Sequence, residues 1–323
     1  MSTPTIDDSF MVRVEPLRKE LTAHCYRMVG SVHEAEDLVQ ETYLNAWRGF
    51  GKFENRSSLR TWLYQIATNT CLSALRGKHR RPLPTGLGQP SSDPHGELPT
   101  RDDLHWLEPL PDSMVWGNVD PDPADEAIIR DSVRLAFVAA LQHLTPQQRA
   151  VVLLCDVLSW RAKEAAAALG VSVAAVNSSL QRARAQLSKQ RAAEDTDQSA
   201  QHDRQLLDKY VAAFEDYDVD KLVTLLTDET IWEMPPFTGW FQGAEAIGAL
   251  VREQCPAKRA GDMRILRTSG NGQPVLAVYL RDADDEYRPF QLHQLTLGAA
   301  KVAHVVCYFD TSLFATFGLP ETL

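Results

Sequence analysis

The stretch RAKEAAAALGVSVAAVNSSLQRARAQLSKQ, residues 161–190, predicts two helices joined by a tight turn. Ala166 is small enough for a close helix crossing, Gly170 has the conformational freedom that the turn needs, and Ser172 can cap the second helix. That second helix has one apolar stripe, at positions i, i+4, i+7 and i+11: Val176, Leu180, Ala183 and Leu187. The pattern predicts a helix-turn-helix.

The opposite face of the second helix is small, amidic and basic, and consists of Ala174, Ala175, Asn177, Ser178, Gln181, Arg182 and Arg184. Small side chains let a helix enter the major groove, where Asn or Gln pairs with adenine and Arg contacts phosphate or guanine. This element therefore favours DNA binding. An ordinary helical hairpin with a basic surface is the alternative.

A second informative stretch is DLVQETYLNAW (37–47), followed by FENRSSLRTWLYQIATNTCLSALRGKHRR (53–81). It predicts helices over 33–49 and 58–77, with Ser57 or Ser58 as a cap. Aromatic side chains alternate with basic ones, an arrangement suited to single-stranded DNA, whose bases stack on aromatic rings. The alternative is that Trp62 and Tyr64 belong to a core.

The net charge of −10 is unevenly distributed. Residues 48–81 contain eight Lys or Arg and one acidic residue, and residues 149–191 contain seven Lys or Arg and two acidic residues. Residues 82–131, in contrast, contain two Arg and eleven acidic residues. Basic blocks attract phosphate, although many are only solvated helix faces.

The five cysteines form no CxxC or His-Cys cluster, and we find no phosphate-binding loop, so we expect no metal and no cofactor. Without a run of eighteen apolar residues or a signal peptide, we expect no membrane association and a cytoplasmic protein.

Taken in order, EAEDLVQETYLNAW, RSSLRTWLYQIATN and, after a long linker, LTPQQRAVVLL with the helix-turn-helix resemble regions 2 and 4 of the extracytoplasmic-function (ECF) sigma factors. This resemblance implies an alternative sigma factor that binds core RNA polymerase and promoter DNA and directs transcription initiation. Family members often have Lys or Arg where this chain has Asn177 and Ser179, so the −35 preference does not carry over.

The resemblance also implies site residues. The surface that docks on polymerase would include Asp37, Gln40, Glu41 and Trp47. The residues that capture and separate the −10 strands would be Phe53, Asn55, Arg56, Ser57, Ser58, Arg60, Thr61, Gln65 and Asn69. The −35 element would be read by Ser172 together with the polar face of the second helix described above.

Residues 203–323 predict an α+β domain: helices first, then antiparallel strands near 262–269, 274–281, 287–297 and 301–309. WEMPPFTGWFQGAEAI (232–247) resembles the SnoaL-like, cone-shaped barrels, whose cavities sometimes hold an Asp/His pair. The corresponding cavity residues would be Trp232, Glu233, Trp240, His293, His304, Tyr308 and Asp310. We expect this domain to regulate the sigma core by direct contact and to catalyse nothing.

The chain is therefore expected to be multidomain, with two all-α sigma domains and an α+β barrel. The expected boundaries are region 2 at 10–80, an acidic linker at 81–125, region 4 at 126–191, a short linker at 192–202 and the SnoaL-like domain at 203–323. Regulation by an anti-sigma protein or a small ligand stays open. The alternatives are a ligand-sensing helix-turn-helix regulator and a cyclase-like enzyme fused to a DNA-binding part.

Overall fold

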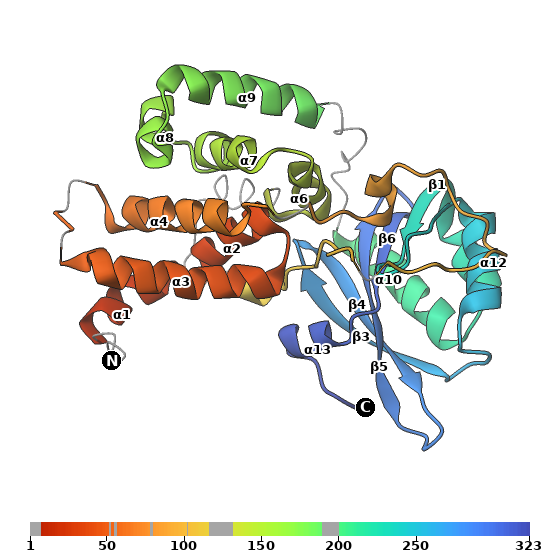
Figure 1. Cartoon of the computed structure of the whole chain (residues 1–323). Helices are drawn as coiled ribbons and strands as arrows, with labels where there is room; N and C mark the ends of the chain where they lie inside the picture. Colours follow the sequence, from red (N-terminus) through yellow and green to blue (C-terminus); the bar gives the residue numbers. More distant parts are fainter. Residues whose placement is uncertain are drawn as a thin grey trace. The chain divides into compact units, whose positions relative to one another are not determined.

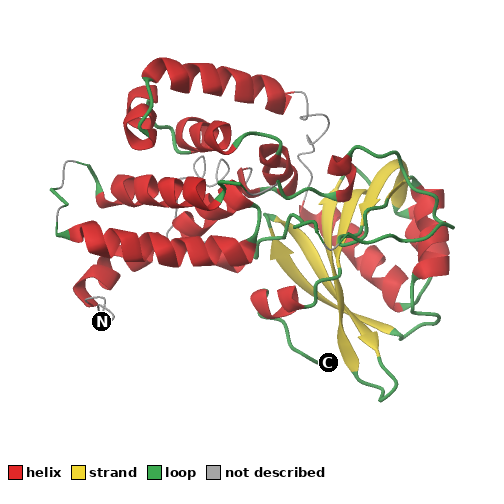
Figure 2. Ribbon diagram, viewed as in Figure 1, coloured by secondary structure: helices red, strands yellow, loops and turns green. Residues whose placement is uncertain are grey.

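A computed structural model describes residues 8–51, 53–54, 57–77, 80–101, 103–115, 132–188 and 200–323 (Figures 1 and 2). The chain divides into two compact units. The helical unit comprises Met1–Arg81 and Leu107–Ala192, and the mixed unit comprises Pro82–Trp106 and Ala193–Leu323. The segment Pro82–Trp106, which we call the strap, therefore belongs to the mixed unit although it connects two parts of the helical unit.

The first part of the helical unit contains α1 (Asp8–Val14), η1 (Glu15–Leu17), α2 (Arg18–Val29), α3 (Val32–Phe50) and α4 (Leu59–Ala74). Gly30 ends α2 in the left-handed conformation at φ 74°, and Ser31 caps α3 by accepting from the Glu34 N–H. The expected cap of α4 is confirmed at Ser58, whose Oγ accepts from the Thr61 N–H at 3.0 Å.

The second part contains η3 (Asp112–Met114), α6 (Leu135–Gln142), α7 (Pro146–Val152), the π-turn η4 (Leu153–Val157), α8 (Ala162–Leu169) and α9 (Val173–Ser188). Pro146 occupies the first turn of α7, behind a capping box of Thr145 and Gln148. Helix α7 ends at Val152, where the chain continues as the wider turn η4. Helices α8 and α9 meet at Gly170, which is left-handed at φ 64°, so the predicted helix-turn-helix is confirmed.

The mixed unit contains η2 (Pro84–Leu87), α10 (Ala200–Glu215), α11 (Val219–Thr224), β1 (Leu226–Glu233), β2 (Trp240–Gln242), α12 (Ala244–Gln254), β3 (Met263–Gly270), β4 (Gln273–Arg281), β5 (Tyr287–Leu297), β6 (Val302–Tyr308) and α13 (Ser312–Thr316). Its sheet is open, with strand order β2-β1-β6-β5-β4-β3. The antiparallel meander expected for β3 to β6 is confirmed. The short β2 was not expected, and β1 pairs with β6 in parallel.

One face of this sheet packs with α10, α11 and α12 into a single apolar core (Figure 1). Trp232, Phe241, Leu276 and Val305 belong to that core, and Leu98 of the strap packs against its edge. Because side chains alternate along a strand, the residues between these positions occupy the opposite face, which we call the outer face. The sheet thus presents two chemically distinct surfaces.

Candidate functional site

The α9 face expected to read DNA is exposed. Ser172, Ala174, Asn177, Ser178, Gln181, Arg182 and Arg184 are exposed, and Ala175 is half-buried. The apolar stripe is turned inward, with Val176 and Ala183 fully buried. Ser172 caps the helix as expected, since its Oγ accepts from the Ala175 N–H at 3.2 Å. Ser179 is buried and lies with the stripe, so its difference from other family sequences does not alter the exposed face.

The two arginines of this face differ in their partners. Arg184 makes a two-pronged ion pair with Asp156, from Nη2 to Oδ1 at 2.5 Å and from Nε to Oδ2 at 3.1 Å. Arg182 has no ion-pair partner among the residues that the structure describes. Arg182 is therefore the more available cation for a phosphate, whereas Arg184 would first have to release the Asp156 carboxylate.

The loop between α3 and α4 is anchored by stacked aromatic rings. Phe53 lies on Trp62 with ring centroids 4.7 Å apart and an interplanar angle of 27°. Phe50 contacts both Phe53 and Trp62, and its other side meets Phe10 at 5.0 Å. Phe53 therefore fixes the loop to the domain. Trp62 is half-buried, so the expectation of a core role holds for part of its surface.

The remaining residues expected to act on the −10 element lie along α4 and its N-terminal turn. Ser57 and Ser58 are exposed, while Thr61 and Gln65 are half-buried. Asn55 and Arg56 lie outside the described residues.

Arg60 and Asn69 on α4 both have partners within the helical unit. Arg60 pairs with Glu20 of α2 at 2.7 Å, and the same carboxylate accepts from the Tyr64 hydroxyl at 3.0 Å. Asn69 Nδ2 donates to the Ala168 carbonyl in α8 at 3.3 Å. Two predicted DNA-contacting side chains are thus engaged with protein groups in this state. Sequence reasoning missed both Glu20 and Ala168.

The residues expected to dock on polymerase lie on α3. Asp37, Gln40 and Glu41 are exposed, whereas Trp47 is half-buried, with its ring 5.5 Å from that of Phe10. Leu44, one turn beyond Gln40 and Glu41, is 40% exposed and was missed. Leu44 therefore adds an exposed apolar side chain to the face that is expected to dock on polymerase.

Glu108, in the segment after the strap, caps α3 from a distant part of the sequence. Its Oε2 accepts from the Ser31 Oγ and the Val32 N–H, both at 2.9 Å. A carboxylate at a helix N-terminus satisfies free N–H groups and complements the helix dipole. Leu107 and Leu110 beside it are fully buried. Part of the segment expected to be a linker is therefore ordered and packs within the helical unit.

The expected cavity residues of the mixed unit are divided between the two faces of the sheet. Trp232 and His293 lie in the apolar core, with ring centroids 5.5 Å apart. Strand register places Glu233, His304, Trp240 and Tyr308 on the outer face, because they alternate with core residues. Asp310 is exposed and accepts from the Ser312 N–H and Oγ, so it caps a turn. The structure does not bring the seven together.

A carboxylate–histidine pair is present, and of the two carboxylates expected near the cavity, Glu233 and Asp310, it is Glu233 that contacts a histidine. Glu233 Oε1 lies 2.8 Å from His304 Nε2, and Glu233 is fully buried. His293 faces aromatic rings, and its Nδ1 lies 3.1 Å from the Tyr210 hydroxyl. Burial lowers the pKa of His293 to about 3, so this ring is neutral at physiological pH.

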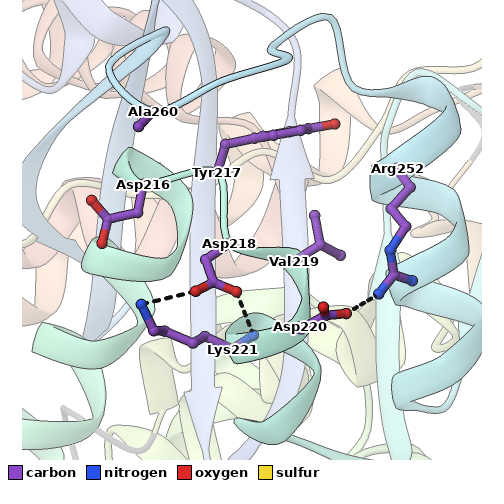
Figure 3. Close-up of a pocket in the computed structure, with 8 residues that line it drawn as sticks. All are labelled: Asp216, Tyr217, Asp218, Val219, Asp220, Lys221, Arg252 and Ala260. Carbon is purple, nitrogen blue, oxygen red and sulfur yellow. Dashed lines mark hydrogen bonds and ion pairs between the residues drawn. The ribbon is translucent and has the colours of Figure 1, made fainter.

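A surface hollow of about 530 Å³ lies elsewhere in the mixed unit, between α11 and α12 (Figure 3). Four of its five charged groups are paired with one another: Asp218 with Lys221 at 2.8 Å, and Asp220 with Arg252 at 2.5 Å. It contains none of the expected cavity residues.

Comparison with known proteins identifies three segments. Residues 13–81 match the model of Sigma-70 region 2, residues 134–187 that of Sigma-70 region 4, and residues 207–305 that of the SnoaL-like domain. The chain is 58% identical to the ECF RNA polymerase sigma factor SigG of Mycobacterium tuberculosis over 320 residues, which cover 97% of this chain and 85% of SigG. This protein is an ECF sigma factor.

Other members of the ECF family resemble it over different lengths. The crystal structure of M. tuberculosis SigJ matches 96% of this chain and 99% of its own, with a TM-score of 0.59 and 23% identity, which shows a shared fold. SigW of Bacillus subtilis is 39% identical over 71 residues, 22% of this chain and 38% of SigW. The expected family and fold class are confirmed.

In this ECF sigma factor, the ion pair of Arg184 predicts a gain of DNA affinity. Replacing Asp156 with Asn should free the guanidinium for phosphate and raise the affinity of full-length protein for duplex DNA about threefold at low salt, with a steeper salt dependence. Fluorescence anisotropy over a range of salt concentrations measures both. Asp208→Asn is the matched control, since Asp208 pairs with Arg267 in the mixed unit. An unchanged salt slope would contradict a DNA-facing role for Arg184.

Within the described ranges of this sigma factor, no helix has the length and apolar character needed to cross a bilayer. The same residues contain no group of three or more His, Cys, Asp or Glu side chains placed to hold a metal ion.

Proposed function

We propose that this sigma factor binds core RNA polymerase through the exposed face of α3, opens the −10 element with α4 and the preceding loop, and reads the −35 element with α9. The observation that carries the proposal is the exposed polar and basic face of α9, backed by an inward apolar stripe. Such a helix fits the major groove and presents amide and guanidinium groups to base edges and phosphates.

The proposal requires the helical unit to open. At 3.4 Å per base pair, the roughly 25 base pairs between elements named −35 and −10 extend about 85 Å. In the helical unit, however, Asn69 of α4 donates to Ala168 of α8 at 3.3 Å, and Arg149 of α7 donates to Met28 of α2. We infer that this packed arrangement is a resting state and that promoter engagement separates the two halves.

We propose a regulatory, non-enzymatic role for the SnoaL-like domain, in the cytoplasm beside RNA polymerase. Two features support it. The imidazole in its core, His293, is neutral and faces aromatic rings, while the Glu233–His304 pair lies on the outer face against the strap. A partner of the anti-sigma type or a small ligand is compatible with this role.

Transcription in vitro tests the proposal, with core polymerase, a promoter library and the full chain. Initiation at a defined pair of −35 and −10 elements is expected. Failure both to bind core polymerase and to initiate would overturn the assignment of these roles.

Replacing Arg182 with Ala should weaken promoter binding uniformly and reduce the slope of log K against log salt by about one phosphate contact. The measurement is a salt titration of promoter binding by the holoenzyme. Arg204→Ala, at an exposed position of α10, serves as the control with an unchanged slope. An unchanged slope for Arg182→Ala would remove this residue from the DNA interface.

A further inference from the structure

The strap is bound to the mixed unit by main-chain hydrogen bonds around residues 237–240. The Ser92 N–H donates to the Trp240 carbonyl at 2.7 Å, and the Trp240 indole N–H donates to the Gln89 carbonyl at 2.9 Å. A second run of the strap returns on the other side, where Thr100 bridges to Phe237 and the Thr238 N–H donates to the Pro99 carbonyl at 2.9 Å. Strand β2 is an edge strand, and edges are the places where sheets accept additional peptide.

A buried carboxylate holds the start of the strap. Glu233 Oε2 accepts from the Thr85 N–H at 2.7 Å, while Oε1 faces His304 Nε2. A carboxylate removed from water is costly unless hydrogen bonds satisfy its oxygens. The strap thus supplies one of the two partners of Glu233. Water can hydrate Glu233 Oε2 only when the strap is undocked.

The surface is shaped for close approach of the strap. A Cβ added at Gly239 would lie 3.0 Å from the Ser92 Oγ and 3.5 Å from its Cβ. Glycine therefore leaves the room that the Ser92 side chain occupies, and a larger side chain at this position would displace it. At the rim, His95 Nδ1 lies 2.5 Å from Glu253 Oε1, an exposed contact that contributes little.

The middle of the strap has little apolar surface with which to stay docked, although Leu83 near its start is buried. Between Gly88 and Arg101, Leu98 is the one large aliphatic side chain. Segments of this composition bury too little apolar area to offset the entropy of ordering, so they bind with modest affinity. We therefore expect this middle part to exchange between bound and free states.

We propose that the outer face of the SnoaL-like domain at Glu233 and His304, together with Gly239 just before β2, is a receptor for the strap, and that docking restrains initiation until the strap is released. The functional half rests on the proposed sigma function, in which promoter engagement separates the two halves of the helical unit that the strap connects. The segment that occupies this receptor is the strap of the same chain, because residues 85–100 make the contacts described above. The carboxylate–histidine pair thus acts as an anchor for a peptide N–H.

Hydrogen exchange of the full chain tests the docking. Glu233→Leu removes the acceptor of the Thr85 N–H, and Gly239→Leu blocks Ser92. In either variant, peptides covering residues 84–100 should exchange about tenfold faster, with β4 and β5 unchanged as the folding control. Glu233→Gln, which keeps an acceptor oxygen, should retain most of the protection. Glu229→Leu is the matched control on the same strand, because Glu229 is exposed and its side chain contacts Gln242.

Transcription by the same variants tests the consequence. Initiation with core polymerase should rise at least about threefold for Glu233→Leu and Gly239→Leu and stay at the wild-type rate for Glu229→Leu. Unchanged exchange in both variants would overturn the receptor. Faster exchange without more initiation would overturn the restraint while leaving the sigma function intact. Absence of initiation by every form, wild type included, would instead contradict the proposed function.

Discussion

Replacing Arg149 with Met should destabilise the helical unit by about 3 kcal/mol. This guanidinium is 3% exposed and donates to three carbonyls: Leu141 at 3.0 Å, Leu144 at 3.4 Å and, across to the other half, Met28. Met28 and Leu141 lie in the last turns of α2 and α6, where carbonyls lack partners within the helix. Burial lowers the pKa of Arg149 to about 10, so it stays charged at neutral pH and complements both helix dipoles.

Urea unfolding followed by helical circular dichroism measures this loss, which corresponds to a fall in Tm of about 6–12 °C. Because the Met28 contact joins the two halves, amide exchange in α8 near Ala168 should accelerate as well. Arg48→Met, at an exposed position of α3, is the control and should change stability by less than about 0.5 kcal/mol. A loss below about 1 kcal/mol for Arg149→Met would mean that water replaces the guanidinium and that Arg149 does not hold the halves together.

Local features were predictable because the residues that determine them are neighbours. Ser58, Gly170 and Ser172 act within one turn of their own position, and the structure confirms each. The apolar stripe of α9 follows the same rule. Ser179 could have been assigned to this buried side as well, since it follows Val176 by three residues.

Contacts between distant segments were not predictable, because no pattern in the chain specifies the partner. Glu108 caps α3 across 76 positions, and Arg149 reaches Met28 across 121. An isolated Arg in the apolar run of α7 gives no sign that it is buried. These are the contacts that assemble the helical unit from its two parts.

The Glu233–His304 pair was unpredictable for the same reason, because its two residues lie on different strands. A His–carboxylate pair was expected, and residue type alone favoured Asp310 as strongly as Glu233. The partner depends on which face each residue occupies, and therefore on the parallel register that sets Ile231 opposite His304. A shift of one residue would exchange the two faces. That the strap contacts this face could not be predicted from the sequence either, since the strap makes these contacts mainly with its backbone groups.

Acid should destabilise both units well above the range where carboxylates titrate, because each unit buries a neutral histidine. Burial lowers the pKa of His24 in the helical unit and of His293 in the mixed unit from 6.5 to about 3. Above pH 6.5 neither the folded nor the unfolded chain binds these protons, so stability is complete. Below pH 6.5 the unfolded chain takes up a proton that the folded chain does not.

Each histidine should therefore cost about 1.4 kcal/mol per pH unit between pH 6.5 and 3, or about 2.7 kcal/mol at pH 4.5. His24→Gln keeps a polar group for the Thr68 hydroxyl, 2.9 Å from His24 Nε2, and His293→Gln does the same for Tyr210. Each variant should flatten the pH dependence of its own unit and leave that of the other unchanged. Exposed His105 provides the control substitution, His105→Gln.

Urea titrations at pH 7.0, 5.5 and 4.5, with peptide-resolved hydrogen exchange to separate the units, measure these slopes. The lowest pH stays above 3.8, the usual pKa of Asp262, whose own pKa is lowered to about 2 by hydrogen bonds from the Lys258 N–H and Arg281. Carboxylates of that kind lose their stabilising contribution only at more acidic pH, so the slope between pH 6.5 and 4.5 reports the histidines. If the slope persisted in His24→Gln, His24 would have to accept a proton within the folded helical unit, and its contact with Thr68 would have to rearrange on acidification.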